Sequence, residues 1–167
     1  MSEIIKQQDT RRTFIDTLIE LAEKDDKVVL VLCDTGFNYV EDFKKRFPDR
    51  IFNFGITEQS TVMICVGLAL SGFKPYFYSM IPFVLFRPGE MVRNGIVNHH
   101  ANVKVLGVKG GPSYKMLGFS HNLLHDKEDF NFCDNISLKH HNLQTNEEVK
   151  SAVLESYKDG TACYIRL

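Results

Sequence analysis

The chain has 167 residues, of which 44% are hydrophobic and 25% are charged, a composition typical of one globular domain. Its 20 basic and 21 acidic residues nearly cancel, so there is no basic excess with which to bind nucleic acid. No uncharged apolar run is long enough to span a membrane, and the polar N-terminus lacks a signal-peptide core. We therefore expect a single cytoplasmic domain over residues 1–167.

The sequence alternates helical and strand patterns from one end to the other. Helices are expected over residues 10–23, 39–47, 58–70, 83–99, 126–133 and 146–158. Strands are expected over residues 28–32, 51–54, 74–79, 103–108, 136–139 and 162–167. Thr57 and Asn146 are the expected caps of the helices that follow them. This alternation predicts an α/β fold with an open, mainly parallel sheet and helices on both of its faces.

The helix over residues 58–70 is apolar almost all round, which indicates that it is buried in its own domain or against a partner. The four cysteines lie far apart in the sequence and form no CxxC pair. We expect them to be reduced, buried thiols, as is usual in the cytoplasm.

Ligands of parallel α/β folds bind beyond the carboxyl ends of the strands. Each of four segments that follow expected strands carries glycine or polar side chains. They are Asp34–Gly36, Gly55–Glu58, Ser79–Arg87 and Gly110–His121. This argument locates a site but names no reaction.

Short motifs distributed along the chain indicate a resemblance to a known family. They are residues 53–59 (Asn-Phe-Gly-Ile-Thr-Glu-Gln), 66–72, 74–75, 78–79, 82–83, 93–94, 106–108, 118–121 and 164–166. In this order they resemble the pyrimidine-binding domain of the transketolase family, whose G-I-x-E-Q run opens a helix. The resemblance covers nearly the whole chain and implies the fold of that domain.

The resemblance implies thiamine diphosphate as the cofactor and Glu58 as a catalytic residue. The cofactor acts as a carbon nucleophile and then as an electron sink. Its aminopyrimidine takes up the activating proton only as an imino tautomer, and a carboxyl group that shares a proton with the ring nitrogen favours that tautomer. Without the surrounding motifs, Glu58 would be read as an ordinary acidic residue in the first turn of a helix.

A flat aminopyrimidine needs an aromatic platform. Phe83 and Phe86, three residues apart on one expected helical face, match aromatic positions of the family that contact this ring. Ile56 matches a position at the edge of the ring. The alternative is that both phenylalanines belong to the core, since the chain has 13 of them.

By the same resemblance, His121 is a catalytic residue that faces a substrate oxygen, where an imidazole can move a proton near neutral pH. Here Phe119 and Ser120 replace the proline and threonine of the family's G-P-T-H run. Arg87 is a weaker candidate at the substrate entrance, and Asp34 is a weaker candidate near the cofactor cleft. The doublets 99–100 and 140–141 are read as surface histidines, and no metal ligand is assigned.

The sequence has no Gly-Asp-Gly run, which in the family belongs to the domain that binds Mg²⁺ and the diphosphate. The resemblance therefore implies a partner subunit that carries this motif, in an assembly expected to be α₂β₂. The function expected first is transfer of a ketol unit between sugar-like carbonyl substrates. Two alternatives stay open: a two-chain 2-oxoacid decarboxylase or acyloin-forming lyase, and a regulatory module that keeps the fold without catalysis.

Overall fold

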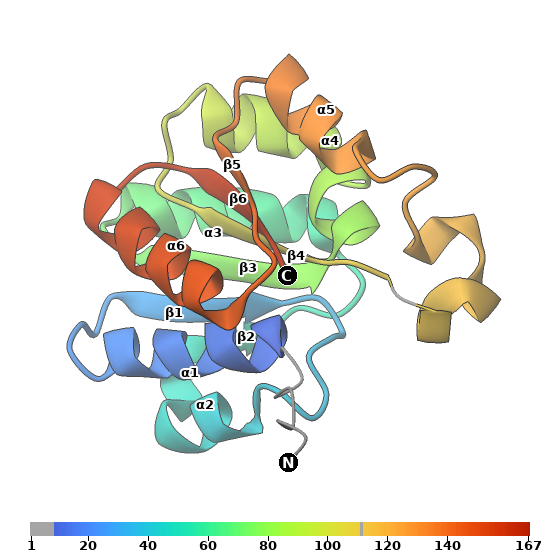
Figure 1. Ribbon diagram of the computed structural model, residues 1–167. Helices are drawn as coiled ribbons and strands as arrows, with labels where there is room; N and C mark the ends of the chain where they lie inside the picture. Colours follow the sequence, from blue (N-terminus) through green and yellow to red (C-terminus); the bar gives the residue numbers. More distant parts are fainter. Residues whose placement is uncertain (1–8, 111) are drawn as a thin grey trace, which may run out of the picture.

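The computed structural model describes residues 9–110 and 112–167. The polar segment 1–8 and Gly111 of the expected glycine-rich loop lie outside the described residues. The strands are β1 (Val28–Leu32), β2 (Ile51–Asn53), β3 (Lys74–Met80), β4 (Lys104–Val108), β5 (His140–Asn142) and β6 (Cys163–Arg166). Within the described residues they form one sheet in the order β2-β1-β3-β4-β6-β5, and every neighbouring pair is parallel (Figure 1). The predicted α/β class with a parallel sheet is confirmed.

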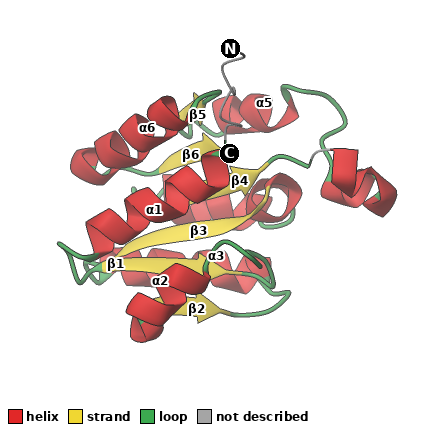
Figure 2. Cartoon of the chain, turned by 60° about the horizontal axis from the view of Figure 1, so that its bottom comes forward, coloured by secondary structure: helices red, strands yellow, loops and turns green. Residues whose placement is uncertain are grey.

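Helices cover both faces of this sheet, as Figure 2 shows. One layer contains α1 (Thr10–Ala22), α2 (Glu41–Arg46) and α6 (Asn146–Asp159). The other contains α3 (Glu58–Leu70), α4 (Gly89–Met91) and α5 (Glu128–Asn135), with π-helical turns over Pro82–Phe86 and Val92–Val97. Short 3-10 turns cover Pro48–Arg50, Pro112–Leu117 and Phe119–His121.

The core lies on both faces of the central strands because most residues of those strands are apolar. All five residues of β1 and all five of β4 are buried, as the continuous apolar runs predicted. All four cysteines are buried and free. Burying this apolar surface is the main stabilising contribution to the fold, at roughly 25 cal/mol per Å².

Two expected elements are wrong. Residues 136–139 form no strand: Ile136 ends α5, and Ser137 has φ +59, while Leu138 donates its N–H to the carbonyl oxygen of Cys133. The strand begins four residues later than expected, at His140. Leu138 is buried within this turn, and its apolar side chain made the segment resemble a short buried strand in the sequence.

The helix expected over residues 83–99 is not continuous. Pro88 has no N–H to donate, and on either side of it the bonding shifts to the i+5 pattern of a π-turn. Arg87 N donates to Pro82 O over 2.9 Å, and Asn98 N donates to Arg93 O over 3.1 Å. The wider coil alters which side chains share a face, and this matters at the site.

The expected caps are correct only in part. Thr57 stands at the N-cap of α3, but its hydroxyl donates to the carbonyl of Phe54 rather than capping the helix. Asn146 is the first residue of α6, and the cap is Thr145, which forms a capping box with Glu148.

Candidate active site

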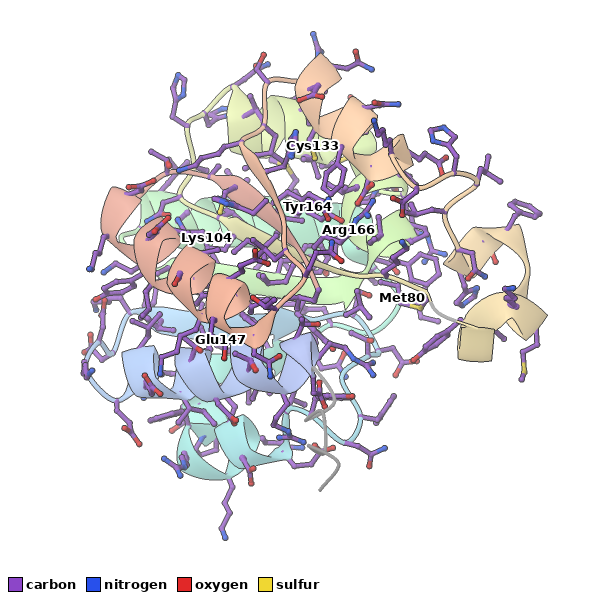
Figure 3. The ribbon with its side chains drawn as sticks, in the orientation of Figure 1. Met80, Lys104, Cys133, Glu147, Tyr164 and Arg166 are labelled. Carbon is purple, nitrogen blue, oxygen red and sulfur yellow. The ribbon has the colours of Figure 1, made fainter. Side chains whose placement is uncertain are left out.

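A cavity of about 400 Å³ opens where the strand order reverses between β1 and β3. This reversal is the position at which parallel α/β sheets bind ligands. All four segments selected from the sequence contribute to its wall. The lining includes Cys33, Asp34, Thr35 and Gly36; Ile56 and Glu58; Ser79, Met80, Phe83 and Arg87; and Tyr114, Leu117 and His121. In Figure 3, Met80 marks this end of the sheet and Lys104 the opposite end.

Glu58 is buried at the wall of this cavity, with a relative exposure of 3%. It is the first residue of α3, and the left-handed backbone of Gly55, with φ +69, turns the chain from β2 into this helix. The helix dipole favours a carboxylate in this first turn. Its Oε1 also lies 2.6 Å from Nη1 of Arg87, a partner 29 residues along the chain that the sequence did not reveal.

Phe83, Arg87 and His121 form a contiguous group beside this carboxylate. The Cζ atom of Arg87 lies 4.1 Å from the centroid of the Phe83 ring. The ring of His121 meets that of Phe83 edge to face, with centroids 4.9 Å apart and an interplanar angle of 84°. The structure therefore brings together the predicted acid, one predicted aromatic platform and the predicted imidazole.

Phe86 lies elsewhere. It packs edge to face against Phe132 of α5, with centroids 5.8 Å apart, and it is not among the residues that line the cavity. The π-turn explains this, because residues three apart in it no longer share a face as they do in an α-helix.

The loop that carries His121 is braced from within. The side-chain amide of Asn122 donates to the carbonyl oxygens of Tyr114 and Gly118, over 3.0 and 2.7 Å. The hydroxyl of Ser120 lies 2.9 Å from Nδ1 of His121. In Figure 1 this segment, drawn in gold, projects at the carboxyl ends of the strands.

The two remaining candidates lie at the cavity mouth. Ile56 has a relative exposure of 72%, and Asp34 is also exposed. The backbone N–H groups of Asp34 and Gly55 both donate to Oδ1 of Asn53, over 2.9 and 3.1 Å. The side chain of Asn53 thus connects the segment that follows β1 to the segment that follows β2.

The sequence analysis gave no individual site role to several of the lining residues. Arg11 of α1 lies over the ring of Tyr39, with its Cζ 4.2 Å from the centroid. Tyr78 lies within the buried stretch of β3, and burial raises the pKa of its hydroxyl. Ser79 is 1% exposed, and its hydroxyl has no hydrogen-bond partner among the described residues. Being on strand ends and on a first helical turn was the signal that could have identified them.

Cys33 is the thiol of the cavity wall. Its Sγ donates to Oγ1 of Thr61 over 3.2 Å, and burial raises the pKa of the thiol. A thiol held in its neutral form is a weak nucleophile, so Glu58 and His121 are the groups here that are suited to proton transfer.

Among the described residues, no cluster of three or more His, Cys, Asp or Glu side chains could hold a metal ion. No helix in the described ranges is long and apolar enough to cross a membrane.

Comparison with known proteins identifies a matching family and several relatives. A family model described as "Transketolase, pyrimidine binding domain" matches residues 6–167. The chain is 41% identical over 117 residues to an apulose-4-phosphate transketolase subunit of Phocaeicola vulgatus, a match that covers 70% of this chain and 38% of that protein. It is 29% identical over 117 residues to a 6-deoxy-6-sulfo-D-fructose transketolase subunit of a Clostridium species, covering 70% of this chain and 36% of the relative.

A solved structure described as "Split gene transketolase, inactive beta4 tetramer" is 28% identical and superposes with a TM-score of 0.82. The superposition covers 95% of this chain and 50% of the solved chain. The chain therefore matches half or less of the length of these three proteins.

Proposed function

The chain belongs to the transketolase pyrimidine-binding domain family, and we propose that it supplies the pyrimidine-binding half of a thiamine-diphosphate site. The observation that carries this proposal is Glu58: a carboxylate 3% exposed, at a helix start, in the wall of a cavity that also has an aromatic ring and an imidazole. Stability alone requires none of these three groups at this place, since burying a charge is costly.

The residues present fit the aminopyrimidine of the cofactor. When bound, thiamine diphosphate supplies a nucleophilic carbon and an electron sink for carbonyl chemistry. In this proposal Glu58 shares a proton with the pyrimidine nitrogen, and Phe83 offers its ring as a platform. His121 moves a proton at the substrate oxygen. Ile56 packs at the edge of the pyrimidine ring, and Asp34 faces the substrate at the cavity mouth.

Phe86 has a different proposed role from Phe83. Because it packs against Phe132 rather than lining the cavity, we propose that it supports the turn that presents Phe83. A direct contact between Phe86 and the cofactor would require this π-turn to rearrange.

A partner chain would supply the rest of the site. We propose that this partner carries the Gly-Asp-Gly motif, Mg²⁺ and the diphosphate contacts, in an α₂β₂ assembly. Exposed apolar side chains on α3 and beside it support such an interface; they include Phe54, Ile56, Met63, Ile64 and Leu70. The relatives described as transketolase subunits support the same division of the enzyme. Four buried free thiols fit a cytoplasmic enzyme.

The proposed reaction is transfer of a ketol unit between carbonyl substrates. The names of the two curated relatives favour it over the decarboxylase or lyase alternative. Incubating the assembled enzyme with a ketose and, separately, with a 2-oxoacid separates them, because only the second reaction releases carbon dioxide. A complex that binds thiamine diphosphate but turns over neither substrate would favour the regulatory module.

Glu58→Gln tests the role of the carboxyl group. The amide is nearly isosteric but cannot share its proton in the same way, so turnover of the assembled enzyme should fall by more than about 100-fold, or roughly 2.7 kcal/mol of barrier. A loss below about tenfold, or 1.4 kcal/mol of barrier, would remove Glu58 from the mechanism. Glu41→Gln is a matched control, because Glu41 also occupies the first position of a helix but lies outside the cavity lining.

A further inference from the structure

The side chain of Arg87 bridges two groups that the proposed function assigns to the cofactor ring. Its Nη1 donates to Glu58 Oε1 over 2.6 Å, and its guanidinium lies over the Phe83 ring at 4.1 Å. All three residues line the same cavity. Arg87 therefore contacts both this carboxylate and this ring.

A guanidinium and an aminopyrimidine have much in common as ligands. Both are flat and delocalised, both stack on aromatic rings, and both present polar groups at the edge of the plane. A ring that stacks on this face of Phe83 and meets Oε1 of Glu58 needs the volume that the Arg87 guanidinium fills. The two cannot be there together.

We propose that Arg87 acts as an internal substitute for the aminopyrimidine: in the free chain it occupies the place of the ring, and it must swing out before the cofactor binds. Arg87 thereby sets the affinity of the site for the cofactor. The inference rests on the proposed function, and it replaces the expectation that Arg87 lies at the substrate entrance.

A substitute of this kind solves a physical problem of the free chain. The side chain of Glu58 is only 4% exposed, and a buried carboxylate without a partner is strongly destabilising. Arg87 provides that partner. When the pyrimidine edge replaces Arg87, Glu58 would take up a proton from solvent and share it with the ring nitrogen, so the carboxyl group would have a hydrogen-bond partner in both states.

The side chain of Arg87 can also move out of this position. It is 41% exposed, so its charged end can return to water without crossing the core. Its backbone is held independently: the N–H of Arg87 donates to Pro82 O over 2.9 Å, and its carbonyl accepts from Gln59 Nε2 over 3.4 Å. Swinging the side chain therefore leaves the turn that presents Phe83 in place.

The experiment is titration of the full chain with thiamine, which carries the aminopyrimidine but no diphosphate and so needs no magnesium site. Binding is followed by calorimetry and by NMR shifts of the Phe83 and His121 rings. Arg87→Gln removes the charged fork and should bind thiamine on the order of tenfold more tightly than the parent, equivalent to about 1.4 kcal/mol. Arg87→Lys keeps the charge but not the flat fork, and its affinity should lie between the two.

Arg46→Gln is the matched control. Arg46 also pairs with a glutamate over 2.6 Å, but on the surface and away from the cavity, so its replacement should leave thiamine affinity unchanged. A second readout follows the Nη1 protons of Arg87, which donate to Glu58 Oε1, by ¹⁵N NMR: they should be protected from hydrogen exchange in the free parent and lose that protection at saturating thiamine. Thermal unfolding confirms that each variant folds, and Arg87→Lys serves if Arg87→Gln does not.

Equal or weaker thiamine binding by both Arg87 variants would overturn the inference, as would Nη1 protons of Arg87 that stay protected at saturation. Failure of the proposed function has a different signature. In that case Glu58→Gln and Phe83→Ala would bind thiamine as well as the parent does, or no chain in the set, Arg87→Gln included, would bind it.

Discussion

Lys104 is a lysine in the core, and its replacement should change how stability depends on pH. It is 1% exposed at the start of β4, at the end of the sheet opposite the cavity (Figure 3). Its Nζ donates to the side chain of Asn102 and, over 2.5 Å, to the carbonyl of Thr161. Burial lowers the pKa of Lys104 from 10.5 to about 8; nearby Cys163 raises it and Lys74 lowers it further.

The sign of the effect follows from linkage. Between pH 8 and 10.5 the unfolded chain holds more protons on Lys104 than the folded chain does, so this residue makes the free energy of unfolding rise with pH. Over the whole window the gain is at most about 3 kcal/mol, at 1.36 kcal/mol for each pKa unit. Between pH 7 and pH 9.5 it is about 2 kcal/mol.

Urea unfolding of the parent and of Lys104→Met at these two pH values measures this gain. Thiols and tyrosines that are exposed on unfolding titrate in a similar range but are common to both proteins, so the difference between the two proteins isolates Lys104. The parent should gain about 2 kcal/mol relative to the variant as pH rises, whereas exposed Lys44→Met should show no such change. A difference that stays constant or reverses in sign would refute the reasoning.

Four further substitutions have defined outcomes. Gly107→Ala should destabilise the fold by roughly 1–3 kcal/mol or more in urea unfolding, because the new Cβ would lie 2.6 Å from the fully buried Tyr164 ring. Gly67→Ala is its control: the new Cβ meets nothing within 4 Å, so this change should stabilise α3 by up to about 1 kcal/mol. Asp129→Asn should cost roughly 3–5 kcal/mol of unfolding free energy, since Arg166, only 5% exposed, loses its buried carboxylate; a loss below about 1 kcal/mol would contradict this. His121→Ala should reduce kcat of the assembled enzyme by about 10²- to 10⁴-fold while thiamine affinity changes little, and an unchanged kcat would return His121 to a loop residue.

Much of the fold was predictable because its central strands are buried on both faces. A continuous apolar run such as residues 28–32 has few structural alternatives when polar residues such as Lys27 and Asp34 lie at its two ends. The edge strand β5 was misplaced for the opposite reason. It consists of His140, His141 and Asn142, and its pairing with β6 comes from tertiary contacts rather than from an apolar pattern.

The positions of the site were predictable where they follow strand ends, and the contacts within it were not. Gly55 and Glu58 belong to one turn, so the short motif that contains them determines their relative positions. The pairing of Glu58 with Arg87 and the separation of Phe86 from Phe83 both depend on a π-turn. The sequence pattern of that turn is equally compatible with an α-helix. The exposed loop beyond β4 gave a residue type, His121, but not its contact with Phe83.

The most direct test of the central claim is where the aminopyrimidine sits on this chain. Nuclear Overhauser contacts between the pyrimidine methyl group of thiamine and the protein should appear at Phe83 and Ile56 in the Arg87→Gln chain. They should be lost or strongly weakened when Glu58→Gln is added. Contacts at another surface, or the same contacts at full strength without the Glu58 carboxyl group, would contradict the assignment of this cavity as a pyrimidine site.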